Sequence, residues 1–144
     1  MSVHPLAGQR VRACDYPDLE EIKEAYNKTI PCMDEPAQRV SFGTSGHRGK
    51  ATDGSFTALH VGSVVQAICN LRQSFGASGP VFVGADTHYL SQLAYQTTLK
   101  VLAYNKIAAC TDCEGDFVPT PSVSRAVLRY NENRSEKRGD GIII

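Results

Sequence analysis

The chain is organised around the stretch Ser41-Phe-Gly-Thr-Ser-Gly-His-Arg-Gly49. Its three glycines disfavour both a helix and the interior of a strand, because glycine loses the most backbone freedom when it is ordered. Backbone N–H groups and the hydroxyls of Thr44 and Ser45 supply hydrogen-bond donors, and Arg48 adds a planar, permanently charged guanidinium. The stretch therefore predicts a loop that binds a phosphate or a carboxylate. Because it matches neither of the common glycine-rich phosphate-binding patterns, a turn that binds nothing is the alternative.

The composition is typical of one folded globular domain. The chain has 144 residues, of which 42% are hydrophobic and 21% charged, so we expect a sizeable core and no extended disorder. Lysine and arginine together number 15, as do aspartate and glutamate, so the bulk charge predicts neither a nucleic-acid nor a membrane partner. The sequence contains no apolar run of about 18 residues that would predict a membrane span. Its first residues lack the apolar segment of a secretory signal.

The cysteines predict a reducing, cytoplasmic location. Their number is odd and their spacing irregular, which is not typical of a disulfide framework. Cys110 and Cys113 form a C-x-x-C pair. A zinc site usually has a second such pair or nearby histidines, and a redox dithiol usually opens a helix, whereas this pair ends an expected strand. A thiol or metal site at this pair is therefore kept as an alternative to an ordinary loop.

Helical and strand patterns alternate along most of the chain. Apolar residues recur at helical spacing in four segments, at 19–26, 57–75, 90–102 and 120–130. Short apolar runs predict strands, at 39–42, 80–83, 107–110 and 141–144. Asp15 is expected to cap the first helix, Ser55 the second and Thr120 the fourth, and Gly76 to end the second. The alternation predicts an α/β fold with a largely parallel sheet that is covered on both faces.

In open α/β sheets, ligands bind beyond the carboxyl ends of the strands. The loops expected there offer a polar cluster suited to a phosphorylated, hydroxyl-rich ligand, formed by Thr44, Ser45, His47, Arg48, Asp86, Thr87, His88 and Thr120. Asp86 and Thr87 have the alternative of capping the next helix, and His88 that of a supporting or surface residue. Arg48 is the strongest candidate for ligand contact, because its forked guanidinium matches phosphate geometry.

Three segments of the chain carry a family resemblance. Phe42-Gly-Thr-Ser-Gly-His-Arg-Gly49, Val83-Gly-Ala-Asp-Thr-His-Tyr-Leu-Ser91 and Phe117-Val-Pro-Thr-Pro-Ser-Val-Ser124 resemble, in this order, segments of the α-D-phosphohexomutase superfamily in its bacterial phosphoglucomutase branch. The resemblance covers residues 40–144 and implies a three-layer α/β/α sandwich on a mixed, largely parallel four-stranded sheet. Residues 1–39 are then an N-terminal arm and helix, and residues 40–144 an incomplete first domain.

The resemblance also implies a reaction. Family members interconvert glucose 1-phosphate and glucose 6-phosphate in carbohydrate metabolism. An active-site phosphoserine donates its phosphoryl group, glucose 1,6-bisphosphate is the intermediate, and Mg²⁺ lies next to the serine. In such proteins a strand like residues 140–144 leads into the phosphoserine loop, and later domains carry the other functional loops. We therefore expect this chain to stop before the phosphoserine, to hold no catalytic residue and no metal ligand, and to be inactive alone.

Residue by residue, the resemblance implies that Arg48 contacts the phosphosugar, while Thr44, Ser45 and His47 shape the loop around the phosphoserine. Supporting roles fall to Gly43, Gly46, Asp86, Thr87, His88 and Thr120. The resemblance to the branch, and no physical argument, favours glucose over mannose. The alternative is a non-catalytic α/β domain that binds a phosphosugar or a partner through the same loop.

Overall fold

The computed structural model describes residues 5–43, 46–115 and 117–144. Within these residues, helices and strands follow in the order α1 (Leu19–Lys28), α2 (Ala58–Leu71), β1 (Ala77–Gly84), α3 (Tyr89–Tyr104), β2 (Ala109–Cys110), α4 (Thr120–Asn131) and β3 (Arg138–Ile143). Short 3₁₀ helices cover Ala13–Asp15, Pro36–Gln38 and Arg72–Phe75. This alternation confirms the predicted α/β class. None of the described helices is both long enough and apolar enough to cross a membrane.

The sheet has the strand order β2-β1-β3, and both pairings are parallel. Val81 in the central strand aligns with Ala109 of β2 and with Asp140 of β3. The expectation of a mixed, four-stranded sheet is therefore corrected: the described residues form three strands, all parallel. Residues 39–42, which were expected to be a strand, are irregular, and only an isolated antiparallel bridge between Gly43 and Gly46 follows them.

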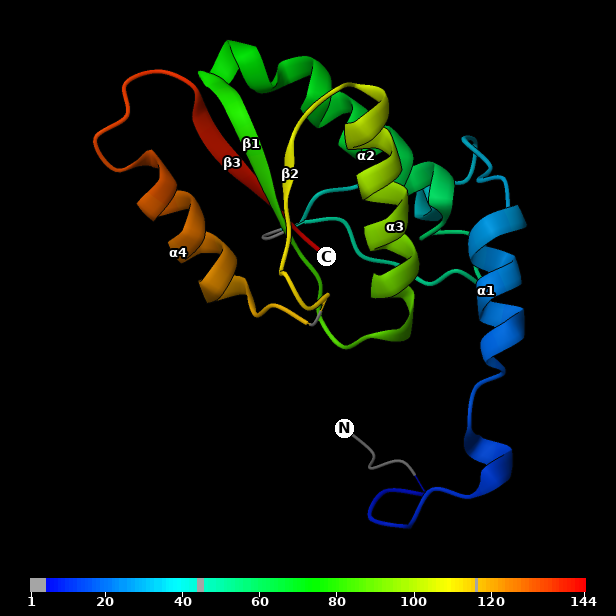
Figure 1. The fold of residues 1–144 in the computed structure, drawn as a ribbon. Helices are drawn as coiled ribbons and strands as arrows, with labels where there is room; N and C mark the ends of the chain where they lie inside the picture. The colour runs from blue at the N-terminus through cyan, green and yellow to red at the C-terminus, as the bar shows by residue number, and fades with distance from the viewer. Residues whose placement is uncertain (1–4, 44–45, 116) are drawn as a thin grey trace.

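Helices cover both faces of the sheet. Successive side chains of β1 point to opposite faces, so β1 contributes side chains to the packing on each face. Val81 and Val83 are buried in the main core, to which α2 and α3 contribute most of the other side chains. On the other face, the Phe82 ring meets the Tyr130 ring of α4 edge-on, with centroids 5.5 Å apart. Figure 1 shows α4 on one side of the sheet, α2 and α3 on the other, and α1 outside α3. The structure thus confirms the α/β/α arrangement.

Helix α1 is fixed to the domain through Tyr26. This side chain is 1% exposed and belongs to the main core. Its hydroxyl lies 2.9 Å from Oγ1 of Thr97 on α3. Because Thr97 donates its own hydrogen to the carbonyl of Leu93 at 3.0 Å, Tyr26 must be the donor in this pair. Burial raises the pKa of Tyr26, so its hydroxyl keeps the hydrogen that this contact needs.

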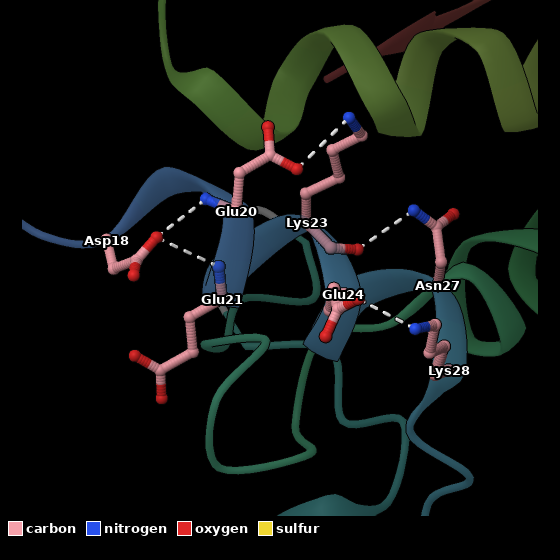
Figure 2. Close-up of polar contacts among 7 residues, drawn as sticks. All are labelled: Asp18, Glu20, Glu21, Lys23, Glu24, Asn27 and Lys28. Atoms are coloured by element: carbon pink, nitrogen blue, oxygen red, sulfur yellow. Dashed lines mark hydrogen bonds and ion pairs between the residues drawn. The ribbon is translucent and has the colours of Figure 1, made fainter.

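The first turn of α1 is capped by Asp18, whose carboxylate accepts hydrogen bonds from the N–H groups of Glu20 and Glu21 at 2.9 and 3.2 Å. Figure 2 shows this cap together with the ion pairs between successive turns of the helix. The expectation that Asp15 caps this helix is wrong. Asp15 ends a 3₁₀ turn instead, where its carboxylate pairs with the guanidinium of Arg12.

Helix α2 begins later and ends earlier than expected. Its cap is Thr57 and not Ser55, and the Thr57 N–H donates to Nδ1 of His60, three residues on, at 3.1 Å. The segment that was expected to be helical to residue 75 is α-helical only to Leu71, and the 3₁₀ helix Arg72–Phe75 follows it. Gly76 ends the segment with a φ of 76°, as expected for a left-handed terminal glycine.

Candidate functional site

The carboxyl ends of the strands meet at one edge of the sheet. The N–H of Ile144 donates to the carbonyl of Gly84 at 2.9 Å, and the N–H of Asp86 donates to the carbonyl of Ile144 at 2.8 Å. The N–H of Val118 donates to the carbonyl of Ala85 at 3.0 Å. These bonds join the end of β3, the loop after β1 and the segment before α4. The structure therefore brings together the loops that were expected to follow β1 and β2.

Asp86 and His88 organise the start of α3. Oδ1 of Asp86 accepts hydrogen bonds from the His88 N–H at 2.9 Å and from the hydroxyl of Ser91 at 2.5 Å. These two donors, with Ser91 the stronger, lower the pKa of the Asp86 carboxyl. His88 is the capping residue, since its Nδ1 accepts from the N–H of Leu90 at 3.2 Å. Asp86 thus supports the helix start without being its cap, while the neighbouring Thr87 is exposed.

Sequence reasoning missed the role of Ser91, which is 7% exposed and holds the Asp86 carboxylate. The available signal was a serine in the first turn of an expected helix, five residues after an aspartate that follows a strand. A side chain there can reach back towards the residues before the helix. Asp86 and Ser91 therefore both stabilise the turn between β1 and α3.

Thr120 is not the cap of α4, contrary to expectation. It is the first helical residue and is exposed, and the capping position belongs to Pro119. The carbonyl of Pro119 accepts from the N–H groups of Ser122 and Val123 at 2.9 and 3.4 Å. Because the first helical hydrogen bonds reach Pro119, the threonine side chain is too far along the chain to cap them.

Two glycines of the glycine loop, Gly43 and Gly46, lie close together. The N–H of Gly43 donates to the carbonyl of Gly46 at 3.2 Å. Gly46 has a φ of 131°, a conformation that residues with a Cβ rarely adopt. Thr44 and Ser45, the two predicted hydroxyl donors, lie outside the described residues. The sequence requirement for glycine at position 46 therefore has a direct backbone cause.

His47 anchors the loop to the segment that precedes α2. Its Nε2 lies 2.9 Å from the carbonyl oxygen of Ser55, and its Nδ1 lies 3.3 Å from both the nitrogen and the oxygen of Ser41. Its ring stacks on His60 with centroids 5.2 Å apart and on Phe56 with centroids 6.0 Å apart. Both ring nitrogens are thus engaged within the chain, which suits the predicted loop-shaping role.

A second anchor holds the loop at Gly49. A Cβ built on this residue would lie 2.5 Å from the carbonyl oxygen of Ser55, so only glycine allows the two segments to approach this closely. The N–H of Lys50 donates to the Ser55 hydroxyl at 2.9 Å. Ser55 in turn donates from its hydroxyl and its N–H to Asp53, which lowers the pKa of that carboxyl. Ser55, the residue that was expected to cap α2, therefore holds the loop through this hydrogen bond and this close approach.

Arg48 lies between these two anchors and is exposed. An arginine on a loop that is held on both sides presents its guanidinium from a defined place on the surface. The backbone on either side of Arg48 is therefore held in place by His47 and Gly49. A guanidinium can form two parallel hydrogen bonds to a phosphate, so Arg48 stays a predicted ligand contact.

A separate groove of about 700 Å³ lies between α2, the following 3₁₀ helix and the first residues of β3. Val40, Phe42, Leu71 and Phe75 line it, and each is an exposed large hydrophobic residue. None of the predicted site residues that the structure describes lines this groove. Its apolar walls do not suit a phosphorylated sugar, so we place the candidate site at the polar loops.

A magnesium ion is part of the chemistry that the resemblance implies. The described part of the chain contains no group of three or more His, Cys, Asp or Glu side chains arranged to hold a metal ion. The residues present therefore do not fit a metal site, and we derive no metal-assisted step from them. All the cysteines are free thiols, including Cys110 and Cys113.

Comparison with known proteins decides the family. A family model described as "Phosphoglucomutase/phosphomannomutase, alpha/beta/alpha domain I" matches residues 39–144. The chain belongs to the phosphoglucomutase/phosphomannomutase family. A phosphoglucomutase from Komagataeibacter xylinus is similar to this member of the family, with 39% identity over 143 residues. The aligned part is 99% of this chain and 26% of that phosphoglucomutase, so the chain spans about a quarter of its relative's length.

Membership of the phosphoglucomutase/phosphomannomutase family confirms the resemblance and fits the observed α/β/α layers. The matched residues contain both loops described above, the glycine loop and the loop after β1. The division of the chain into an N-terminal arm and helix (residues 1–39) and a domain (residues 40–144) stays a prediction. Helix α1, which precedes the matched region, contributes Tyr26 to the same core as α2, α3 and β1.

Proposed function

We propose that this chain supplies the phosphosugar-binding loop of a phosphoglucomutase that interconverts glucose 1-phosphate and glucose 6-phosphate in carbohydrate metabolism. The observation that carries the proposal is the exposed Arg48 on a glycine loop fixed by His47 and Gly49. Membership of the family supports a mutase, and the similar phosphoglucomutase favours glucose phosphates.

In this proposal Arg48 binds the phosphate of the sugar, and the loop residues Thr44 and Ser45 add hydroxyl and backbone donors around it. His47 keeps the loop in place through Ser55. Phosphoryl transfer depends mainly on positioning and on stabilisation of charge, so a loop of this kind contributes without forming a covalent bond. Gly43, Gly46, Asp86, Thr87, His88 and Thr120 have supporting roles, as residues that shape or flank the loops.

The covalent steps belong to other parts of a whole phosphoglucomutase. We propose that its phosphoserine and its Mg²⁺ site lie outside this chain, that glucose 1,6-bisphosphate is the intermediate, and that the remaining domains close the cleft. A chain continuing from Ile144 would leave the sheet beside Asp86, because the two residues are hydrogen bonded there. That position would place a following loop at the same edge as the loop after β1. We also propose a cytoplasmic location, which the free thiols support.

Isothermal titration calorimetry with glucose 1,6-bisphosphate tests the binding role. We expect the native chain to bind and Arg48→Ala to weaken binding at least tenfold, which corresponds to about 1.4 kcal/mol. Arg48→Lys should fall between the two, since lysine keeps the charge but loses the fork. Arg129→Ala is the matched control, because Arg129 is an exposed arginine in the last turn of α4. Equal weak heats from native protein and Arg48→Ala would contradict the proposal.

A coupled assay for isomerisation of glucose 1-phosphate tests the division of labour. The 144-residue chain should show no turnover, because the phosphoserine is assigned elsewhere. Robust turnover by this chain would overturn that assignment. Binding without turnover in a longer protein that contains this domain would favour the alternative of a non-catalytic phosphosugar-binding domain.

A further inference from the structure

The side-chain amide of Gln38 bridges two segments that lie on either side of the glycine loop. Gln38 ends the 3₁₀ helix Pro36–Gln38, three residues before the loop begins at Ser41. Its Nε2 donates to the carbonyl of Asp53 at 2.9 Å, and Asp53 follows the loop, 15 residues after Gln38. The bridge therefore closes residues 39–52, which include Arg48, into one hydrogen-bonded loop.

The partners of this amide fix its orientation. The N–H of Cys32 donates to Oε1 of Gln38 at 2.8 Å, and the carbonyl of Asp53 accepts from Nε2. An N–H can only donate and a carbonyl can only accept, so the amide cannot be turned over without losing both hydrogen bonds. A carboxylate has no hydrogen to donate, and an apolar side chain of the same length has neither group. Glutamine is thus the side chain of this length that satisfies both partners.

The backbone of Gln38 is attached to α2. Its carbonyl oxygen lies 2.7 Å from Nε2 of His60, a residue that is 4% exposed in the first turn of the helix. Nδ1 of His60 lies 3.1 Å from the N–H of Thr57, which can only donate, so Nδ1 accepts and Nε2 carries the hydrogen that Gln38 receives. Side chain and backbone of Gln38 thus connect the loop after α1, the turn before α2 and α2 itself.

The turn before α2 links this bridge to the glycine loop. Gly54 has a φ of 74°, and a Cβ built on it would lie 3.0 Å from Cδ of Gln38, so glycine allows the amide to pack against the turn. The next residue is Ser55, to which both neighbours of Arg48 are held. The connection from Gln38 to the arginine therefore runs through one turn, residues 53–55.

We propose that Gln38 is a positioning residue that holds the turn before α2, and through it Arg48, in the place from which the arginine binds a phosphate. Gln38 makes no contact with the ligand in this proposal. The inference rests on the proposed function for the role of Arg48, whereas the bridge across the loop is independent of the ligand. One measurement on the loop and one on binding therefore test it.

The Gln38→Met variant of the 144-residue chain tests the bridge by nuclear magnetic resonance. Methionine keeps the length of the side chain and removes both hydrogen bonds without adding a charge. We expect the amides of Gly46, Arg48 and Gly49 to shift and to exchange with solvent about tenfold faster, which corresponds to about 1.4 kcal/mol, while the amides of β1 stay unchanged. Gln73→Met makes the same change at an exposed glutamine and should leave the loop signals in place. Loop signals that stay native-like in Gln38→Met overturn the proposal.

Gln38→Glu gives an independent measurement in case the methionine variant does not fold. Glutamate keeps an acceptor for the N–H of Cys32, but at pH 7 it has no hydrogen for the carbonyl of Asp53. The same loop amides should therefore shift. Native-like loop signals in Gln38→Glu would contradict the bridge.

Calorimetry with glucose 1,6-bisphosphate separates positioning from a general loss of stability. Gln38→Met should weaken binding about threefold to tenfold, and in the Arg48→Ala background it should weaken binding no further, because Gln38 acts through the arginine. Tyr26→Phe is the matched control, since it removes a hydrogen bond between α1 and α3 and should keep the native affinity. An equal loss with and without Arg48, or no loss in a variant whose loop signals have moved, overturns the positioning role. Equal heats from native protein and Arg48→Ala would instead overturn the proposed function, and the loop signals alone would then decide whether Gln38 holds the loop.

Discussion

Arg72 and Asp140 are 68 residues apart in the sequence and form a two-pronged ion pair at the start of β3. Nη2 of Arg72 lies 2.7 Å from Oδ1 of Asp140, and Nε lies 3.0 Å from Oδ2. Nη2 also donates to the carbonyl of Gly79 at 2.6 Å. The arginine side chain is 5% exposed and the aspartate side chain 31% exposed. One buried guanidinium thus joins the 3₁₀ helix after α2 to both β1 and β3.

Asp140→Asn should destabilise the domain by about 3 kcal/mol, the lower end for a broken buried ion pair, because Asp140 is partly exposed. The cause is the buried Arg72 charge that is left without its counter-charge. Urea unfolding followed by circular dichroism measures the change. The double variant Arg72→Met/Asp140→Leu removes both charges and should recover most of the loss. A single variant within about 0.5 kcal/mol of native protein would show that the pair contributes little.

Tyr26→Phe should lower the free energy of unfolding by about 1 kcal/mol, the usual loss for one hydrogen bond. The variant removes the donor to Thr97 and keeps the ring in the core. Thermal and urea unfolding measure it. Tyr16→Phe is the matched control and should have no effect, because Tyr16 is 68% exposed. Equal stabilities for Tyr26→Phe and native protein would contradict the inferred hydrogen bond between α1 and α3.

Gly49→Ala should displace the glycine loop, because the new Cβ would lie 2.5 Å from the carbonyl oxygen of Ser55. Amide chemical shifts of Lys50 and Ser55 report the displacement, and we expect a loss of stability with it. Gly62→Ala gives the opposite result as a control. Gly62 is inside α2 with nothing within 4 Å of its added Cβ, so alanine should stabilise the domain by about 1 kcal/mol. Native-like shifts around position 49 in Gly49→Ala would refute the close approach.

The pH dependence of stability should report the bond between Asp86 and Ser91. This carboxyl has a lowered pKa in the folded chain, so it contributes stability at pH values above its unfolded pKa, about 3.9. That contribution is lost as the pH falls through the lower, folded pKa. Ser91→Ala should raise the pKa of Asp86 towards its ordinary value, as a carboxyl-detected titration would show. The stability difference from native protein should be larger at pH 7 than at pH 3, whereas Ser124→Ala, an exposed control on α4, should show no such pattern.

The sequence alone predicted the class of fold and the order of its elements. Periodic apolar residues are a local signal, so α2, α3 and α4 could be found from their stripes, and β1 from a short apolar run. The glycine content and charge of residues 41–49 located the glycine loop and Arg48, and the family resemblance then implied a phosphosugar as its ligand. The left-handed backbone at Gly76 was also predictable, because glycine adopts a positive φ without steric cost.

Helix caps were less predictable, because several neighbouring polar residues can satisfy the same N–H groups. Asp18 and Thr57 take the positions that were expected of Asp15 and Ser55, and α4 starts after Pro119. The choice depends on where the first helical turn settles against the core. A side chain that is a capable cap in sequence has no effect when the backbone turns a few residues away.

The anchors of the site were decided by tertiary structure. Nothing in the local pattern pairs Arg72 with Asp140, His47 with His60, or Asp86 with Ser91 in a partly buried hydrogen bond. Such contacts depend on how packed helices and parallel strands bring distant or turned segments together. The sequence by itself determined that a glycine loop with Arg48 exists, since glycine content and charge are local properties. Only the folded chain decided that Ser55 holds it, because close approach arises from packing.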